Sequence, residues 1–284
     1  MNDRVQEITE QQKQFWNSES AERWVKNNKS MDRLLAPLTE ILFAIADVKV
    51  GEAVLDLGCG VGSTTERAGQ ATGSSGKVLG LDISAPMLKA AQEKSEAEHV
   101  SFLEADASSH DFSATSFDLA MSRFGIMFFA DPVAAFSNIR GALKPDGRIA
   151  MACWGPRSDN PWFQLPMDVV AEFCGPQPKI PARAPGPTAF GETDYVESIL
   201  NGAGFRNIDI ESREIWLDAG DDIDQTARYV MFMGPASRAL AQYKPEQDVL
   251  DQMVADAKQR LQPYQTARGM EVSGLVHYLT AVAG

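Results

Sequence analysis

Short apolar runs alternate with amphipathic segments from about residue 50 onward. The segments between the runs carry apolar positions at helical spacing, whereas the runs themselves are short and bounded by glycine or polar residues. Strands that alternate with helices are typical of a doubly wound, mainly parallel sheet with right-handed crossovers. The five runs predicted as buried strands are residues 53–57, 78–82, 100–106, 116–122 and 148–154.

One helix between these strands has a clear start signal. Asp131 is expected to be its N-cap, and Pro132 occupies the first helical position. Val133 and Phe136 then begin the stripe that is expected to face the core.

Two regions do not follow this alternation of strands and helices. Residues 8–47 have a helical pattern in which Trp16 and Trp24, eight positions apart, are expected to share one helix face. After Trp154, "GPRSDNPW" and "CGPQPKIPARAPGP" predict a proline-rich loop. The remaining predicted elements are a helix at 192–205, a strand at 207–217, two helices at about 222–241 and 245–262, and a last strand at 271–282.

These elements predict an α/β fold with a doubly wound, seven-stranded, mainly parallel sheet. A helical insertion before the last strand is expected to stand over one edge of that sheet. The expected division is an N-terminal helical lid (1–49), a nucleotide-binding core (50–156), and a C-terminal part (157–284). The last part holds the proline-rich loop, the last strands and the substrate-covering insertion at about 222–262.

A glycine-rich turn, "VLDLGCGVGST" at 54–64, follows the first predicted strand. In open α/β sheets ligands bind beyond the carboxyl ends of the strands, where the strand order reverses, so Gly58 and Gly60 are expected at that crevice. Glycine permits a tight turn and lets a ligand touch the backbone. Ser63 is expected to start the next helix, with Glu66 completing a capping box.

The glycine spacing and the carboxylate of Asp56 argue against a dinucleotide at this turn. The nicotinamide fingerprint is G-x-G-x-x-G, whereas this chain has G-x-G-x-G, with Ser63 where the third glycine belongs. Asp56 lies at the strand end, where a carboxylate repels a pyrophosphate and attracts a cation. Asp82, at the tip of the second strand, is the acid expected to bind two ribose hydroxyls. The pattern indicates a positively charged ribonucleoside, which S-adenosylmethionine fits; a structural turn with solvated strand-end carboxylates is the alternative.

Five segments in order resemble the motifs of the class I S-adenosylmethionine-dependent methyltransferases. They are "VLDLGCGVGSTT", "VLGLDIS", "LEADA", "FDLAMSRFG" and "LKPDGRIAM", within about residues 50 to 154. The stretch "SRFGIMFFADPVAAFSNIRGALKPDGRIAMACW" is similar to a bacterial subgroup of small-molecule methyltransferases, as are "FWNSESAERWV" and "MFMGPASRAL". The resemblance implies a Rossmann-like methyltransferase fold and names a reaction rather than a metabolite.

The resemblance also implies a set of cofactor contacts. Asp56 and the backbone of Gly58 and Gly60 would face the methionine half of S-adenosylmethionine, and Asp82 would bind the ribose hydroxyls. The other implied contacts are Ile83 against the adenine, Asp106 at the adenine amino group, the Ala107 backbone at the ring edge, and the Ser122 carbonyl at the cofactor ammonium.

Catalytic and substrate-binding residues are less defined. His110 is a candidate because histidine is the usual general base for methyl transfer to a hydroxyl; packing near the cofactor or capping a turn is its alternative. Arg123 requires an anion, which the cofactor carboxylate, an acidic substrate or a structural aspartate would supply. Aromatic and methionine side chains are expected to wall the substrate pocket together with Arg123, although such stripes are also typical of cores. They are Trp16, Trp24, Met127, Trp154, Trp162 and Phe232.

Composition narrows the possible partners. The formal net charge of the 284 residues is −13 and no lysine/arginine run is present, which disfavours a nucleic-acid or membrane partner. The three cysteines lack metal-ligand spacing and fit a reduced compartment, and the amino terminus has no apolar signal core. We therefore expect a cytoplasmic protein without a metal, acting as a monomer or homodimer.

The sequence thus predicts an enzyme that transfers a methyl group from S-adenosylmethionine to a small molecule. Alignment of the two reactants in an apolar pocket can drive such a reaction without an acid or base. A catalytically silent S-adenosylmethionine-binding regulator or scaffold of the same fold is the alternative. A nicotinamide oxidoreductase is disfavoured by Asp56 and by the glycine spacing.

Overall fold

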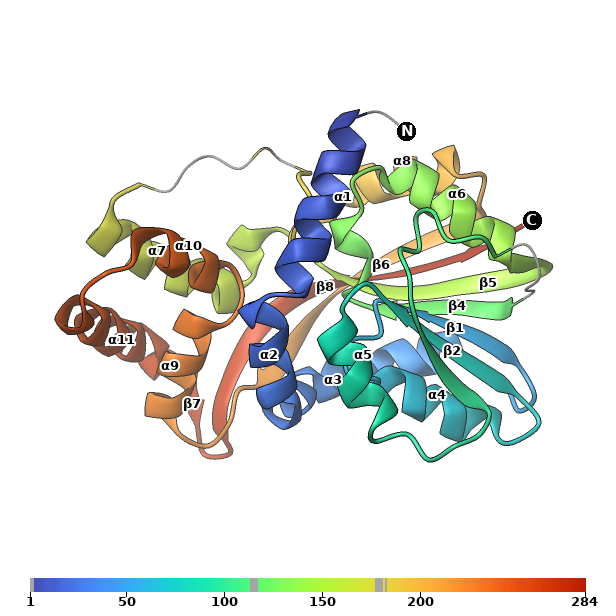
Figure 1. Cartoon of the computed structure of the whole chain (residues 1–284). Helices are drawn as coiled ribbons and strands as arrows, with labels where there is room; N and C mark the ends of the chain where they lie inside the picture. Colours follow the sequence, from blue (N-terminus) through green and yellow to red (C-terminus); the bar gives the residue numbers. More distant parts are fainter. Residues whose placement is uncertain (1–2, 113–116, 177–180, 182) are drawn as a thin grey trace.

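The computed structural model describes residues 3–112, 117–176, 181 and 183–284. A long twisted sheet crosses the molecule, with helices on both faces (Figure 1). Its strand order is β3-β2-β1-β4-β5-β8-β6, and only β8 runs antiparallel to its neighbours. The predicted doubly wound, seven-stranded, mainly parallel sheet is therefore confirmed. The strands are β1 (Ala53–Leu57), β2 (Lys77–Asp82), β3 (Val100–Glu104), β4 (Phe117–Arg123), β5 (Leu143–Trp154), β6 (Arg206–Asp218) and β8 (Gly269–Val282), and the short β7 (Gln265–Thr266) pairs with the start of β8.

Helices cover both faces because the central strands are apolar on both sides. Val54 and Leu55 of β1 are both completely buried although their side chains point to opposite faces. Helices α3 and α4 lie on one face and α6 and α8 on the other (Figure 1). The helices are α1 (Asp3–Trp16), α2 (Glu19–Lys26), α3 (Asn28–Ala46), α4 (Ser63–Thr72), α5 (Ala85–Gln92), α6 (Pro132–Ala142), α7 (Pro161–Cys174), α8 (Thr193–Gly202), α9 (Ile223–Phe232), α10 (Pro235–Tyr243) and α11 (Gln247–Leu261), with short 3-10 turns at η1 (Ile126–Phe128), η2 (Arg157–Asp159) and η3 (Gln262–Tyr264).

The predicted start of α6 is confirmed, but its inward face is partly wrong. Asp131 caps the helix, since its Oδ1 accepts a hydrogen bond of 3.0 Å from the Ala134 amide. Phe136 is fully buried, whereas Val133 in the first turn is 38% exposed. Val133 lies beside Gly202 at the end of α8, where a Cβ placed on Gly202 would be 3.3 Å from the Val133 side chain.

The amino-terminal helical region is interrupted between the two tryptophans. Trp16 ends α1 and Trp24 lies in α2, so the prediction that they share one helix face is wrong. Ser18 separates the helices because its hydroxyl caps α2 by accepting from the Ser20 amide. The chain turns there, and the two indole rings still meet edge to face with centroids 6.3 Å apart.

The C-terminal part contains more helix than predicted. The segment expected to be a proline-rich loop after Trp154 includes α7, which begins with Pro161 at its first position and carries Trp162. The predicted helix at 222–241 is two helices, because Gly234 (φ 69°) and Pro235 break it. Residues 177–180 and 182 of the predicted loop, and Ser116 of the predicted fourth strand, lie outside the described residues.

The insertion α9–α11 stands at the edge of the sheet where ligands bind in this class of fold. Strand β6 runs parallel to β5, so its carboxyl end at Asp218 lies on the same side as the carboxyl ends of β1 and β4. Helices α9, α10 and α11 follow β6 there and pack with α7 in one group (Figure 1). Within the described part of the chain, no helix combines the length and the apolarity needed to cross a bilayer.

Candidate functional site

The loops after β1 and β4 touch at the point where the strand order reverses. Strands β1 and β4 are neighbours, and the chain builds the sheet outward from them in opposite directions. A Cβ placed on Gly58 would lie 2.6 Å from the Cα of Gly125, so both positions require glycine for this close approach. The Ser122 hydroxyl joins the same loops: it donates to the Leu57 carbonyl at 2.7 Å and accepts from the Gly125 amide at 3.1 Å. The resemblance assigned a role only to the Ser122 carbonyl.

Asp56 is a buried carboxylate with one oxygen left without a partner. Its Oδ2 accepts hydrogen bonds of 2.7 Å from the hydroxyls of Thr64 and Thr65 in the first turn of α4. Its Oδ1 is buried and has no hydrogen-bond partner among the described residues. Burial raises the pKa of Asp56 to about 6, although the two threonine hydroxyls and the charge of Arg123 act in the opposite direction. The site therefore holds an acceptor oxygen that no described residue satisfies.

The predicted capping box at the start of α4 is wrong. The residue before the helix is Gly62 in a left-handed conformation, with no side-chain cap. The Ser63 hydroxyl donates instead to Asp32 of α3 at 2.6 Å. A hydrogen bond to Asp32, which is distant in the sequence, thus takes the place of the predicted local capping box with Glu66.

Asp82 ties the end of β2 to the glycine turn. Its Oδ2 accepts a 2.7 Å hydrogen bond from the Gly60 amide, and its Oδ1 accepts one of 2.8 Å from the Ser84 amide. Burial raises the pKa of Asp82, and the backbone amides oppose that shift. Each oxygen retains a lone pair, so the carboxylate can still accept from two ligand hydroxyls. The amides of Gly58 and Gly60 are both bonded within the protein, the first to the Leu81 carbonyl at 2.8 Å. They are consequently not available as donors to a ligand.

The residues assigned to the adenine follow β2 and β3 on the same side of the sheet. The Ile83 carbonyl accepts from the Asn17 side chain at 2.9 Å. Asp106 organises the turn after β3, where its Oδ1 accepts from the Ser108 amide at 2.8 Å, and Ala107 is buried. The His110 ring packs edge to face against Phe112, with centroids 4.7 Å apart. The His110 carbonyl accepts a 2.9 Å hydrogen bond from the side chain of Asn138 in α6, which also donates to the Ala107 carbonyl. The described contacts of His110 therefore fit the packing alternative.

Arg123 pairs with a structural aspartate, the third of its predicted alternatives. Its guanidinium donates to Asp32 Oδ1 at 3.1 Å and to the Thr39 hydroxyl at 3.0 Å. The same Asp32 accepts from Ser63, so α3, the turn after β1 and the end of β4 meet at one carboxylate. Asp32 carried no signal in the sequence, because it lies in α3, far along the chain from both partners.

Aromatic and methionine side chains pack together beside the end of β4. Phe124 has a left-handed backbone (φ 66°) and stacks on Trp154 with ring centroids 4.2 Å apart and planes 7° apart. Non-glycine residues adopt this conformation rarely, and such outliers often mark functional loops. Met127 is only 1% exposed, and its sulfur accepts from the Trp154 amide. Met127 and Trp154 are thus packed in the core beside the turn after β4, and Phe232 is half-buried at the end of α9.

Helix α1 lies across the carboxyl edge and meets both the core and the insertion. The Trp16 ring packs edge to face on Phe128 of η1, with centroids 5.1 Å apart. The Asn17 side chain donates to the Ile83 carbonyl and accepts from the Ala85 amide at 3.0 Å, directly beside Asp82. On the other side, the Arg238 guanidinium of α10 lies 4.4 Å from the centre of the Phe15 ring. None of the α1 residues is buried, so these few contacts hold the helix in place.

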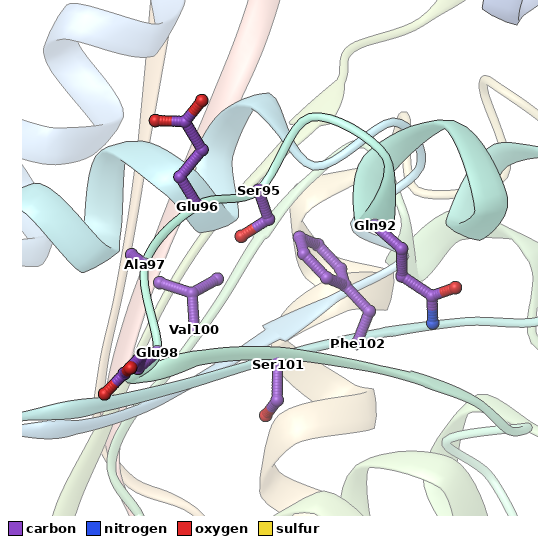
Figure 2. Close-up of a pocket in the computed structure, with 8 residues that line it drawn as sticks. All are labelled: Gln92, Ser95, Glu96, Ala97, Glu98, Val100, Ser101 and Phe102. Atoms are coloured by element: carbon purple, nitrogen blue, oxygen red, sulfur yellow. The ribbon is translucent and has the colours of Figure 1, made fainter.

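A hollow at the opposite end of β3 is separate from this site. Figure 2 shows it between the end of α5 and the start of β3, with Glu96 and Glu98 pointing outward. Val100 begins β3, so the hollow lies at the amino end of the strands, away from Asp82 and Asp106. Within the described ranges, no group of three or more His, Cys, Asp or Glu is arranged to hold a metal ion.

Comparison with known families and proteins gives a consistent picture. A family model described as a methyltransferase domain matches residues 55–151. Nocamycin O-methyltransferase of Saccharothrix syringae is 32% identical over 194 residues, covering 64% of this chain and 68% of the relative. Aklanonic acid methyltransferase DauC of Streptomyces sp. (strain C5) is 33% identical over 44% of this chain and 60% of the relative. Demethylmenaquinone methyltransferase of Staphylococcus carnosus is 29% identical over 58% and 72%.

Solved structures with low sequence identity share the fold. A Haloferax volcanii methyltransferase in complex with the activator Trm112 has a TM-score of 0.55 and 18% identity, covering 94% of this chain and 97% of that one. The [4+2]-cyclase SpnF has a TM-score of 0.51 and 18% identity, covering 86% and 80%. The second case shows that this fold supports more than one kind of reaction. The chain spans 60% of the length of the aklanonic acid enzyme, so its activity must be argued from its own site.

Proposed function

The chain belongs to the class I S-adenosylmethionine-dependent methyltransferases, and from that premise we propose that it transfers a methyl group from S-adenosylmethionine to a small-molecule acceptor. The observation that carries the proposal is the unpartnered Asp56 Oδ1, buried beside the glycine turn at the switch point of the sheet. A buried carboxylate oxygen without a donor is costly, and a cationic ligand removes that cost. S-adenosylmethionine carries an ammonium and a sulfonium charge, so the residues present fit this cofactor.

The other assigned residues fit the remaining parts of the cofactor. Asp82 has two free lone pairs for the ribose hydroxyls. Asp106 and the Ala107 backbone would bind the adenine, with Ile83 packed against it, and the Ser122 carbonyl would accept from the ammonium. When bound, S-adenosylmethionine supplies a methyl group on a positively charged sulfur, and because that charge disappears on transfer an apolar surrounding carries no penalty.

The chain contributes alignment and exclusion of water rather than a strong acid or base. Phe124, Trp154 and Met127 form an apolar wall next to the turn after β4. Helix α1, which contacts η1 through Trp16, would cover the crevice and keep water from the reacting atoms. Holding two reactants in line can account for several kcal/mol of a barrier, up to roughly 7–11 kcal/mol.

The broader assignment follows the same reasoning. The net charge of −13 supports an enzyme without a nucleic-acid partner, and the three free cysteines support a reduced, cytoplasmic compartment. The bacterial assignment rests on the resemblance to the bacterial subgroup, and a monomer or homodimer is the expected state. Residues 1–49 would form the lid, 50–156 the cofactor-binding core, and 157–284 the substrate-covering part with its insertion.

Transfer of a labelled methyl group tests the proposal. The related enzymes are named for aklanonic acid, nocamycin and demethylmenaquinone, so aklanonic acid, demethylmenaquinone and the unmethylated form of nocamycin make up the first panel of acceptors. We expect the label of S-adenosyl-[methyl-³H]methionine to enter at least one of them. Binding of S-adenosylhomocysteine without transfer to any acceptor in an untargeted metabolite screen would instead support the silent regulator or scaffold.

Cofactor binding is expected to depend on pH through Asp56. Its pKa is about 6 in the empty protein, and a nearby ammonium favours the ionised carboxylate, so binding must release the proton at lower pH. The dissociation constant for S-adenosylhomocysteine should be constant above pH 7 and about tenfold weaker at pH 5, one pH unit below that pKa. The same raised pKa makes the empty protein lose stability as the pH rises from about 4 through 6.

Calorimetric titration at several pH values measures this effect. Asp56→Asn should weaken binding at neutral pH and remove the dependence between pH 5 and 7, which separates Asp56 from Asp82 as its source. Affinity of the wild type that does not change from pH 5 to pH 8 would exclude Asp56 from the site.

The lid is expected to be α1 alone. Within the lid region 1–49, α2 buries Ser20 and Ala21, whereas α1 buries no residue, so α1 is the part expected to open. Backbone amides of residues 3–16 should exchange hydrogen fast in the empty protein and more slowly with S-adenosylhomocysteine, while β1 changes little, because a closing element must open readily. Asn17→Ala removes two hydrogen bonds that hold α1 beside Asp82 and should reduce this ligand-induced protection. Slow exchange of α1 in the empty protein, unaltered by the ligand, would identify it as a fixed structural helix.

A further inference from the structure

Strand β6 is a long edge strand whose outer side is unpaired among the described residues. It stands last in the strand order and pairs only with β8 within that part of the chain. Apart from the ladder to β8, no backbone group from Arg206 to Asp218 is bonded to another described residue. Proteins usually protect such an edge with a proline, a covering segment or a very short strand, whereas β6 has 13 residues and no proline. A free edge of this kind can pair with a strand of another chain.

This strand also carries the most exposed tryptophan of the protein. Trp216 is 56% exposed, whereas the other tryptophans are buried or half-buried. Its neighbours Ile215 and Leu217 are buried, so they point into the molecule and the indole points outward. Tryptophan is enriched where proteins contact one another, because its large apolar ring is covered there.

The charges of β6 are complementary to a second copy of the same strand. When two copies pair antiparallel about a two-fold axis at Ser212, residues at equal distances before and after Ser212 lie opposite each other. Glu211 of each copy then lies opposite Arg213 of the other, and no like charges face each other between Asp209 and Ile215. Opposite charges in direct cross-strand pairs stabilise a sheet, whereas like charges destabilise it.

The same charges disfavour the neighbouring registers. Side chains of paired strands must remain on matching faces, so the two-fold axis has to pass through a residue. An axis at Glu211, Arg213 or Glu214 places that residue opposite its own copy, with like charges in contact. The ladder to β8 is regular from Asp209 to Asp218, so this part of β6 is straight enough to pair. The register centred on Ser212 therefore pairs opposite charges without opposing like ones.

We propose that β6 is a homodimer interface, in which the outer edges of two copies pair antiparallel around Ser212 and join two sheets into one. Within one chain Glu211 and Arg213 already form a salt bridge of 2.6 Å, and both side chains are exposed. In the dimer they form a cluster of four alternating charges with the same residues of the second copy. Trp216 lies diagonally across from Ile210 of the second copy, within reach of an aromatic side chain.

This interface is independent of the proposed methyl transfer. Strand β6 lies at the opposite end of the sheet from β3 and is separated by β8, β5 and β4 from β1. Each copy therefore keeps its own cofactor residues. The association is measured without any ligand, so its outcome is separate from that of S-adenosylhomocysteine binding.

Sedimentation velocity of the full chain gives the first test. At about 50 μM, a concentration at which a dimer of micromolar affinity is mostly formed, the mass should be twice the chain mass of 31.0 kDa. The mass of a single chain at that concentration would overturn the proposal.

Charge reversal on β6 gives the second test. Arg213→Glu places carboxylates opposite each other across the axis, and Glu211→Arg places guanidinium groups there, so each variant alone should be monomeric. An equimolar mixture of the two variants should dimerise, because each copy then meets the opposite charge at both positions. The salt bridge within one chain cannot produce this restoration. A dimer that survives either reversal, or variants that do not associate when mixed, would overturn the proposal.

A matched control removes a comparable salt bridge away from β6. Arg183 and Glu192 are 2.6 Å apart and similarly exposed, and Arg183→Glu changes the net charge by the same amount as Arg213→Glu. This control should remain dimeric. Loss of its dimer would show that association depends on net charge alone, which contradicts pairing at β6. Far-UV circular dichroism of each variant should equal that of the wild type, since all the altered side chains are exposed.

Discussion

Replacing Asp82 with alanine is expected to weaken S-adenosylmethionine binding by roughly 2–4 kcal/mol, which corresponds to about 30- to 1000-fold in the dissociation constant. The variant loses a charged acceptor for two ribose hydroxyls, each worth about 1.5–3 kcal/mol before water replaces part of it. It also releases the amides of Gly60 and Ser84, which the carboxylate now positions. The glycine turn therefore loses its tie to β2 at the same time.

Two control variants sharpen this prediction. Glu104 lies opposite Asp82 in the register of β3 and β2, and its side chain is exposed. Glu104→Ala removes a carboxylate from the same edge of the sheet and should leave the affinity unchanged. Asp82→Asn keeps one acceptor oxygen and should bind with intermediate affinity. If calorimetry gives Asp82→Ala the affinity of the wild type, the ribose lies elsewhere.

Gly58→Ala is expected to destabilise the fold by roughly 2–5 kcal/mol. A left-handed backbone costs a non-glycine residue about 1–2 kcal/mol, and Gly58 has φ 63°. The new Cβ would also lie 2.6 Å from the Gly125 Cα, and forcing two backbone segments apart adds about 1–3 kcal/mol. The loops after β1 and β4 would separate where the cofactor is expected to bind.

The chain offers a matched control for this effect. Gly60 has nearly the same backbone conformation, φ 56°, but the nearest atom to its Cβ would be the Met87 sulfur at 3.6 Å, an ordinary contact. Gly60→Ala should therefore cost only the conformational part, roughly 1–2 kcal/mol. Unfolding in denaturant measures both variants. Equal losses of stability would mean that the contact between the two loops contributes nothing.

Local sequence signals predicted the parts of the fold that local interactions determine. The apolar runs of β1 and β2 are buried on both faces, and a strand of that kind has a recognisable sequence. The start of α6 was predictable because Asp131 makes its capping bond only three residues away. The position of Asp56 and Asp82 at the carboxyl edge followed from the alternation of strands and helices alone.

Long-range contacts determine what the sequence could not reveal. Asp32 joins Ser63 and Arg123 across three separate elements, and no local pattern marks it. The Ser63 hydroxyl donates to Asp32 and does not form the capping box that was predicted with Glu66. The Tyr229 hydroxyl is buried and has no hydrogen-bond partner among the described residues, and no local sequence pattern indicates this. The break at Gly234 and Pro235 could have been predicted, because glycine followed by proline interrupts a helix. The prediction of one continuous helix there was wrong.

Calorimetric titration of the protein with S-adenosylhomocysteine and, separately, with NAD tests the central claim most directly. The account predicts binding of S-adenosylhomocysteine at one site per chain and no heat of binding with NAD, because Asp56 favours a cation and the turn lacks the third glycine of a dinucleotide site. Tight binding of NAD, with no response to S-adenosylhomocysteine or S-adenosylmethionine, would contradict it.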